Sequence, residues 1–335
     1  GGNISNAAGS TLTNNGTLHT DGNFTNASTA TLANDGTVTV DGYVSNAGGT
    51  IENDGTLSVN GNLSNTGGTL TNSDTINVKG NLSDTGTYTG TGDIVLNGTS
   101  QTFTPKSGTA YSKVTVSSAT ALTVSGDVEI KNFIHNSGNI TFTGAATITD
   151  SIGGTENTGT LTFNDTLTTG CASSFKNTGL TTLSGAATFG GNASFPGDVK
   201  ASGNITGSGT LSFQNISVTD SVVISGTQVS VASGKTITTT TAGKNLTLKA
   251  SGGTISVGQI GTTSTKFNTV ELDTGSSALS FTSEDVHASS IKLTSTGNVS
   301  VTGIDYDGEL IFNTSAKVSL NGGTDGSKAS KLTDS

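Results

Sequence analysis

Three histidines and one cysteine are the residues of this chain best suited to metal or nucleophilic chemistry. His19, His135 and His287 lie far apart in the sequence, and none has the short spacing of a paired metal-binding motif. Cys171 is the single cysteine, so no intrachain disulfide can form, and no neighbouring base is visible that would activate its thiol. The sequence therefore predicts no catalytic residue, no metal ligand among these four residues and no cofactor, and it names no binding residue.

Carboxylates are densest in the stretch Asp-Tyr-Asp-Gly-Glu near the C-terminus. Asp305, Asp307 and Glu309 are a weak candidate for Ca²⁺, because calcium prefers several oxygen ligands supplied by a short turn. The stretch is shorter than an EF-hand loop, and the glycine-rich calcium nonapeptide is absent. A plain turn is therefore the favoured interpretation.

Other acidic residues recur in Asn-Asp-Gly turns, as at Asp35 and Asp54, where backbone conformation alone explains them. A glycosidase needs two carboxylates about 5 to 10 Å apart, usually beside aromatic platforms. The chain has no Trp, and all 14 of its basic residues are lysines, so it has no Arg to clamp an acidic sugar. The sequence predicts a protein that is not an enzyme, with a polysaccharide-active enzyme as a minor alternative.

The overall composition excludes several other classes of protein. The 335 residues include 48 Gly and carry a formal net charge of −10, which argues against nucleic acid and anionic membrane surfaces as partners. No apolar run is long enough to span a membrane as a helix. Regular pairs such as Val38-Thr-Val40 and Leu161-Thr-Phe163 alternate apolar with polar residues, a pattern typical of strands with one buried face and not of disorder.

A repeat of about 20 residues organises the first hundred positions. Each unit contains three short strand signals separated by Asn, Gly and Asp turns, which predicts one coil of a parallel β-helix. Successive units begin at Gly2, Gly22, Gly42, Gly61 and Gly80. The predicted fold is an all-β, single-stranded parallel β-helix of about 16 or 17 coils, each of about 18 to 21 residues.

Stacking such coils aligns equivalent residues in columns. Aliphatic columns such as Ile4/Phe24/Val44/Leu63/Leu82 are expected to form the core. Asparagines form two further columns, in which each side chain can hydrogen-bond to its copies above and below and can hold a tight corner. These predicted structural ladders are Asn6, Asn26, Asn46 and Asn65, and Asn14, Asn34, Asn53 and Asn72.

The regularity of the pattern changes along the chain. Residues 1–97 are expected to be regular coils, and residues 98–200 to continue the β-helix after an irregular excursion near 98–118, where Pro105 and Tyr111 interrupt the period. Residues 201–322 are expected to form more variable coils, and residues 323–335 a flexible tail.

Threonines form another column, at Thr17, Thr37, Thr56 and Thr75. Paired columns of this kind are used by flat ice-binding solenoids. The neighbouring outward positions are His, Thr, Ser and Asn, which is not a regular lattice, and Thr is also favoured in any exposed strand. An ice-binding solenoid is therefore a second minor alternative.

The tandem segment GNLSNTGGTLTNSDTINVKGNLSDTG and the later stretch GKNLTLKASGGTISVGQIGTTSTKFNTVELDT resemble the passenger regions of large bacterial secreted adhesins, the filamentous-haemagglutinin-like and autotransporter group. The resemblance covers nearly the whole chain in style. It implies a right-handed helix, export across a Gram-negative envelope, and a place outside the cell or on its outer surface.

Two functions are consistent with these features. The first is an adhesin-like stalk that attaches to host cells or other surfaces through a receptor or glycan. The alternative is a subunit of an extracellular fibre or sheath, a homo-polymer whose partners are copies of itself.

Overall fold

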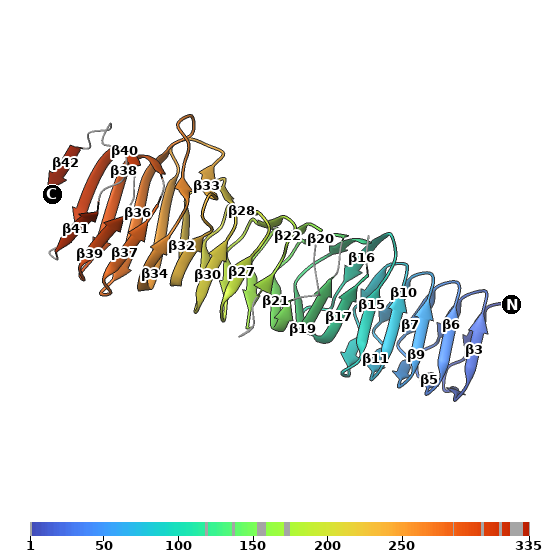
Figure 1. Ribbon diagram of the computed structural model, residues 1–335. Helices are drawn as coiled ribbons and strands as arrows, with labels where there is room; N and C mark the ends of the chain where they lie inside the picture. The colour runs from blue at the N-terminus through green and yellow to red at the C-terminus, as the bar shows by residue number, and fades with distance from the viewer. Residues whose placement is uncertain are drawn as a thin grey trace. The chain divides into compact units, whose positions relative to one another are not determined.

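The chain folds into stacked parallel strands joined by tight turns (Figure 1). The computed structural model describes residues 2–117, 120–135, 138–152, 159–170, 175–283, 285–302, 305–314, 317–321 and 331–334. No helix occurs within these ranges, and so none that is long and apolar enough to cross a membrane. The predicted fold class, an all-β parallel solenoid, is confirmed.

The chain divides into two compact units, Gly1–Asp165 and Thr166–Ser335. The strands of the N-terminal unit are β1 (Ile4–Asn6), β2 (Thr11–Asn14), β3 (Thr17–Thr20), β4 (Phe24–Asn26), β5 (Thr31–Asn34), β6 (Thr37–Val40), β7 (Val44–Ala47), β8 (Thr50–Asn53), β9 (Thr56–Val59), β10 (Leu63–Thr66), β11 (Thr69–Asn72), β12 (Thr75–Val78), β13 (Leu82–Asp84), β14 (Thr87–Thr89), β15 (Asp93–Leu96), β16 (Ser100–Thr104), β17 (Ala110–Val116), β18 (Thr120–Val124), β19 (Val128–His135), β20 (Gly138–Phe142), β21 (Ala146–Ile152) and β22 (Leu161–Phe163).

The first coils of this unit each contain three strands. Within one coil the chain runs through β1, β2 and β3, and the next coil repeats the order one level on. Three parallel stacks result: β1-β4-β7-β10-β13, β2-β5-β8-β11-β14 and β3-β6-β9-β12-β15.

Alternation along each strand decides which side chains are buried. In β5, Leu32 and Asn34 are each 1% exposed, while the residues between and before them face outward. One core column begins Ile4, Phe24, Val44, with each residue directly in register with the next. It continues through Leu63, Leu82, Phe103, Val124, Phe142 and Phe163.

The middle stack ends at β14, after five strands. From β16 to β21, each coil contains two longer strands, and the pairings alternate as β16 with β18 and β17 with β19. Pro105 directly follows β16, and the residues after it form a turn in which the Thr109 N–H donates to the Lys106 carbonyl. The interruption expected near 98–118 is therefore a change from three strands per coil to two.

The C-terminal unit is also built from stacked parallel strands, but its coils vary more in their length and number of strands. Its strands are β23 (Leu167–Thr169), β24 (Phe175–Lys176), β25 (Thr181–Leu183), β26 (Ala187–Phe189), β27 (Ala193–Phe195), β28 (Val199–Ala201), β29 (Ile205–Gly207), β30 (Thr210–Phe213), β31 (Ile216–Val218), β32 (Val222–Val231), β33 (Thr236–Thr239), β34 (Asn245–Ser256), β35 (Gln259–Ile260), β36 (Phe267–Gly275), β37 (Leu279–Thr282), β38 (Asp285–Ser295), β39 (Val299–Thr302), β40 (Asp305–Asn313), β41 (Val318–Asn321) and β42 (Lys331–Asp334).

Several coils of this unit are longer than predicted. Val222 pairs with Leu246, and Ile260 pairs with Val286, so each of these coils contains more residues than a repeat of the N-terminal unit. The described residues consequently form about 14 coils, fewer than the sequence predicts, because longer coils use up the chain faster. At the end of the chain, where a flexible tail was expected, Lys331–Asp334 form β42, which pairs with β40.

Candidate functional site

The first asparagine column forms a continuous chain of side-chain hydrogen bonds through the interior. The Asn6 Nδ2 donates to the Asn26 Oδ1 over 2.8 Å, one coil further along. The same bond joins Asn26 to Asn46 over 2.9 Å and Asn46 to Asn65 over 2.8 Å. Every amide in the column therefore donates in the same direction, toward the C-terminus.

The second hydrogen of each amide is used as well. Nδ2 of Asn26 also donates to the carbonyl of Thr50 over 2.9 Å, and Nδ2 of Asn46 donates to the carbonyl of Thr69 over 3.1 Å. Both asparagines are 0% exposed, so water does not compete for these groups. A buried polar group without a partner is costly, so these hydrogen bonds stabilise the stacked coils. The amides are already paired within the protein, and the column is therefore structural and not a ligand site.

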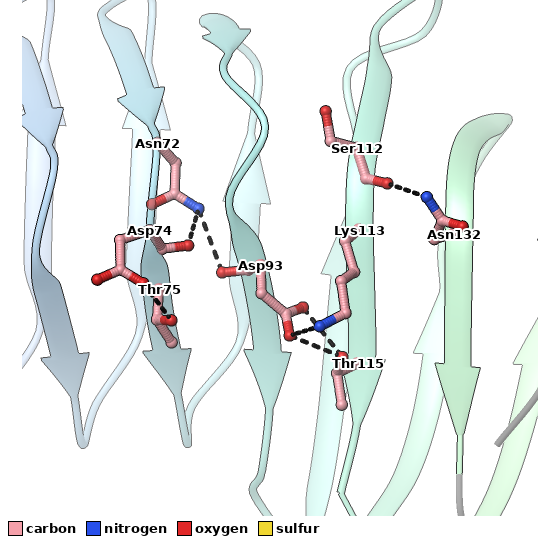
Figure 2. A network of polar contacts seen from close by, with 8 residues as sticks. All are labelled: Asn72, Asp74, Thr75, Asp93, Ser112, Lys113, Thr115 and Asn132. Atoms are coloured by element: carbon pink, nitrogen blue, oxygen red, sulfur yellow. Dashed lines mark hydrogen bonds and ion pairs between the residues drawn. The ribbon is translucent and has the colours of Figure 1, made fainter. Parts of the chain in front are cut away.

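The second column behaves in the same way until its last member. Asn14, Asn34, Asn53 and Asn72 are joined by three Nδ2-to-Oδ1 bonds of 2.8, 2.7 and 2.8 Å. Figure 2 shows the final step, in which the Asn72 Nδ2 donates to the backbone carbonyls of Asp93, over 3.2 Å, and Asp74, over 3.4 Å. This ladder ends on main-chain oxygens at the level where the middle stack ends.

The first ladder ends on a carboxylate. Asp84 is in register with Asn65 and accepts from the Asn65 Nδ2 over 2.8 Å. Its other oxygen accepts from the hydroxyl of Tyr111 over 2.8 Å, and that hydroxyl also accepts from the Lys106 N–H over 3.1 Å. An acceptor-only group suits this position, because a row of donating amides must end on an acceptor.

Tyr111 belongs to an aromatic cluster that fills the core at this level. Its ring centroid lies 4.8 Å from that of Tyr88 and 5.1 Å from that of Phe103. Burial and the nearby Asp84 carboxylate raise the pKa of Tyr111 far above its ordinary value. Burial, opposed by the neighbouring Asn72 amide, raises the pKa of Tyr88 to about 12. Both phenols therefore remain protonated at neutral pH.

Substitution of the two tyrosines provides a matched test of the carboxylate end. Tyr111→Phe removes the hydrogen bond to Asp84 and is expected to lower the free energy of unfolding by about 2 kcal/mol, as for other bonds to charged groups. The Tyr88 hydroxyl is buried and makes no hydrogen bond of normal geometry, so Tyr88→Phe is expected to cost no stability. Urea denaturation followed by circular dichroism compares the two variants, and equal losses would contradict the assignment.

The outer face of the middle stack is rich in threonine. One column is complete over five coils and in register: Thr11, Thr31, Thr50, Thr69 and Thr87. The column beside it contains Ala33 and Glu52 between its threonines, so the two columns do not form a regular lattice. The threonine column of the ice-binding alternative, Thr17, Thr37, Thr56 and Thr75, lies in register in the stack β3-β6-β9-β12. The ice-binding alternative remains a prediction.

Opposite charges also face each other across neighbouring coils. The Lys113 Nζ lies 2.7 Å from the Asp93 carboxylate, which also accepts from the Thr115 hydroxyl over 2.9 Å (Figure 2). In the C-terminal unit, Lys292 contacts Glu271 over 3.1 Å. Such half-exposed ion pairs at the surface add little stability.

A surface groove of about 340 Å³ runs along β29, β32, β34 and β36. Its charged lining residues are Lys249 and Asp273, which pair with each other over 3.3 Å. The groove therefore presents a neutral surface dominated by Ser, Thr and Gly.

The sequence provides no partner for His19, but the structure brings two carboxylates to it. Its Nε2 lies 3.2 Å from the Asp41 Oδ2, and its Nδ1 lies 3.6 Å from the Asp21 Oδ1. A signal for this cluster is present in the sequence, because Asp21 and Asp41 occupy equivalent positions in successive repeats and so lie one coil apart. His19 precedes Asp21 by two positions, so period-2 alternation places both residues near the same corner.

The other candidate residues form no site within the part of the chain that the structure describes. His287 is buried, and its Nε2 lies 2.8 Å from the Asp285 Oδ2. Cys171 and the side chains of His135, Asp305 and Asp307 lie outside the described residues. The backbone of Asp305–Asn313 forms β40, so the acidic stretch that includes Glu309 belongs to a strand and not to the turn that was expected.

Comparison with known proteins finds no matching family model, no matching curated protein and no matching solved structure.

Proposed function

We propose that this chain is a non-enzymatic structural solenoid that acts as an adhesin-like stalk outside the cell or on its outer surface. The observation that carries the proposal is the pair of buried asparagine ladders. The polar side chains inside these coils hydrogen-bond to neighbouring coils. Asn46, for example, uses both its amide oxygen and its amide nitrogen in such bonds. Recognition is then left to the outward side chains.

The outward side chains suit a weak contact that is repeated many times. Threonine hydroxyls stand one coil apart along the middle stack, and each can both donate and accept a hydrogen bond. Repeated polar contacts gain strength through multivalency even when each one is weak. A receptor or glycan on a host cell or other surface is the class of partner that such a face would bind.

Beads coated with the purified chain provide a direct test. We expect these beads to attach to cells or to immobilised glycans, and we expect the soluble chain to compete with them. Beads coated with an unrelated protein of equal net charge are the control. Attachment no greater than that of the control would contradict the proposal.

A size measurement tests the fibre alternative separately. Sedimentation velocity over a range of concentrations is expected to show a single species for a stalk. Filaments that grow with concentration would instead support a homo-polymer built from copies of this chain.

A further inference from the structure

We infer that His19, Asp21 and Asp41 form a surface site for a divalent transition-metal ion such as Zn²⁺. One ligand atom from each residue, a ring nitrogen of the histidine and one oxygen of each carboxylate, lies within 4.8 Å of the other two. Imidazole nitrogen with two carboxylate oxygens is a ligand set that suits Zn²⁺, Cu²⁺ or Ni²⁺. Ca²⁺ and Mg²⁺ prefer oxygen ligands alone.

The coil architecture brings these ligands together. His19 lies on the outer side of β3, where alternation directs Leu18 and Thr20 inward. Asp21 directly follows β3, and Asp41 occupies the equivalent corner one coil later, where its N–H donates to the Thr20 carbonyl over 3.0 Å. Two carboxylates are thus held one coil apart beside a single imidazole.

The side chains can close around an ion without disturbing the core. His19 is 50% exposed, Asp21 is 60% exposed and Asp41 is 41% exposed. Zn²⁺ lies about 2.0 to 2.2 Å from nitrogen and oxygen ligands. Because Asp41 faces Nε2 and Asp21 faces Nδ1, the imidazole must turn so that one ring nitrogen meets both carboxylates, and the three groups must approach each other more closely. Exposed side chains make this adjustment by changing rotamers, and water would complete the coordination.

A neighbouring residue orients one of the carboxylates. The Asn60 Nδ2 donates to the Asp41 Oδ1 over 2.7 Å, and the other oxygen of Asp41 faces His19. Metal-binding carboxylates are commonly held in this way by an outer hydrogen bond. Asn60 is therefore a positioning residue for the site.

Isothermal titration of the full chain with ZnCl₂ tests the site. We expect saturable binding to the parent protein and a loss of affinity of about tenfold or more in His19→Ala and in Asp41→Asn, each of which removes a ligand. Asp35→Asn is the matched control, because it removes one negative charge from an exposed turn of the same coil and is expected to leave the affinity within twofold. Circular dichroism confirms that each variant is folded.

Asn60→Ala tests whether the hydrogen bond to Asp41 helps to position the site. The variant leaves all three ligands in place, and we expect it to weaken Zn²⁺ binding, but by less than His19→Ala does. Absence of saturable binding to the parent, equal affinity in His19→Ala, or displacement of Zn²⁺ by equimolar Ca²⁺ would each overturn the inference.

Discussion

Asn46→Asp is expected to destabilise the N-terminal unit by about 4 kcal/mol at neutral pH, the cost of a buried charge without a compensating partner. In the native chain, Nδ2 of Asn46 donates to the Asn65 Oδ1 and to the carbonyls of Gly49 and Thr69. An aspartate oxygen in its place would face these acceptors with no hydrogen to share. Asn46→Ala removes the same bonds without adding charge and is expected to cost about 2 kcal/mol.

The aspartate variant is also expected to depend on pH in a defined direction. Burial and the surrounding acceptors would raise the pKa of the new carboxyl group in the folded state above its unfolded value. The folded state would then hold the proton more tightly, so stability is greatest at acid pH and falls as pH rises through the carboxyl range. Urea midpoints at several pH values measure this, with Asn15→Asp, at an exposed corner, as the control. A midpoint for Asn46→Asp that follows the control at every pH would contradict the prediction.

Gly55→Ala is expected to cost about 3 kcal/mol or more, as severe overpacking does. A Cβ at this position would lie 2.1 Å from the carbonyl oxygen of Gly36 in the preceding coil. That oxygen is already fixed, because it accepts from the Thr56 N–H over 2.9 Å. The coils would have to separate locally, which breaks the hydrogen bonds between them.

Gly16→Ala provides the matched control for Gly55→Ala. Gly16 occupies the same corner in the first coil, and a Cβ there would meet no atom within 4 Å. Its substitution is expected to be neutral or slightly stabilising, because alanine restricts the unfolded chain. Hydrogen exchange and urea denaturation compare the two variants, and similar losses for both would show that contact between coils is not the cause.

Periodicity predicts the fold well wherever each coil repeats the previous one. The repeat places Phe24 and Val44 in one column and Asn26 and Asn46 in another, and these residues are in register in the structure. The coil number is less predictable. Long strands such as β34 and β38 lengthen the C-terminal coils. Because the sequence there has no fixed period, the length of these coils could not be predicted.

The polar clusters could be predicted only in part. Asp84 stands where a fifth asparagine would continue the first column, so the end of that ladder is visible in the sequence. Its partner Tyr111 lies beyond the turn after Pro105, and no repeat connects the two. The His19 cluster was missed because a search for short spacing ignores contacts between coils, which join residues a whole repeat apart.

The uniform direction of the first ladder has an evolutionary consequence. Each asparagine from Asn6 to Asn65 makes the same side-chain hydrogen bond to the equivalent residue of the next coil. Only Asp84, at the end of the ladder, also bonds to a side chain outside the column, that of Tyr111. Duplicating or deleting a whole repeat between these ends would leave each amide matched to an acceptor. Gene duplication can therefore change the length of this region in steps of one coil, about 4.8 Å each, while the sequence of the remaining coils stays unchanged.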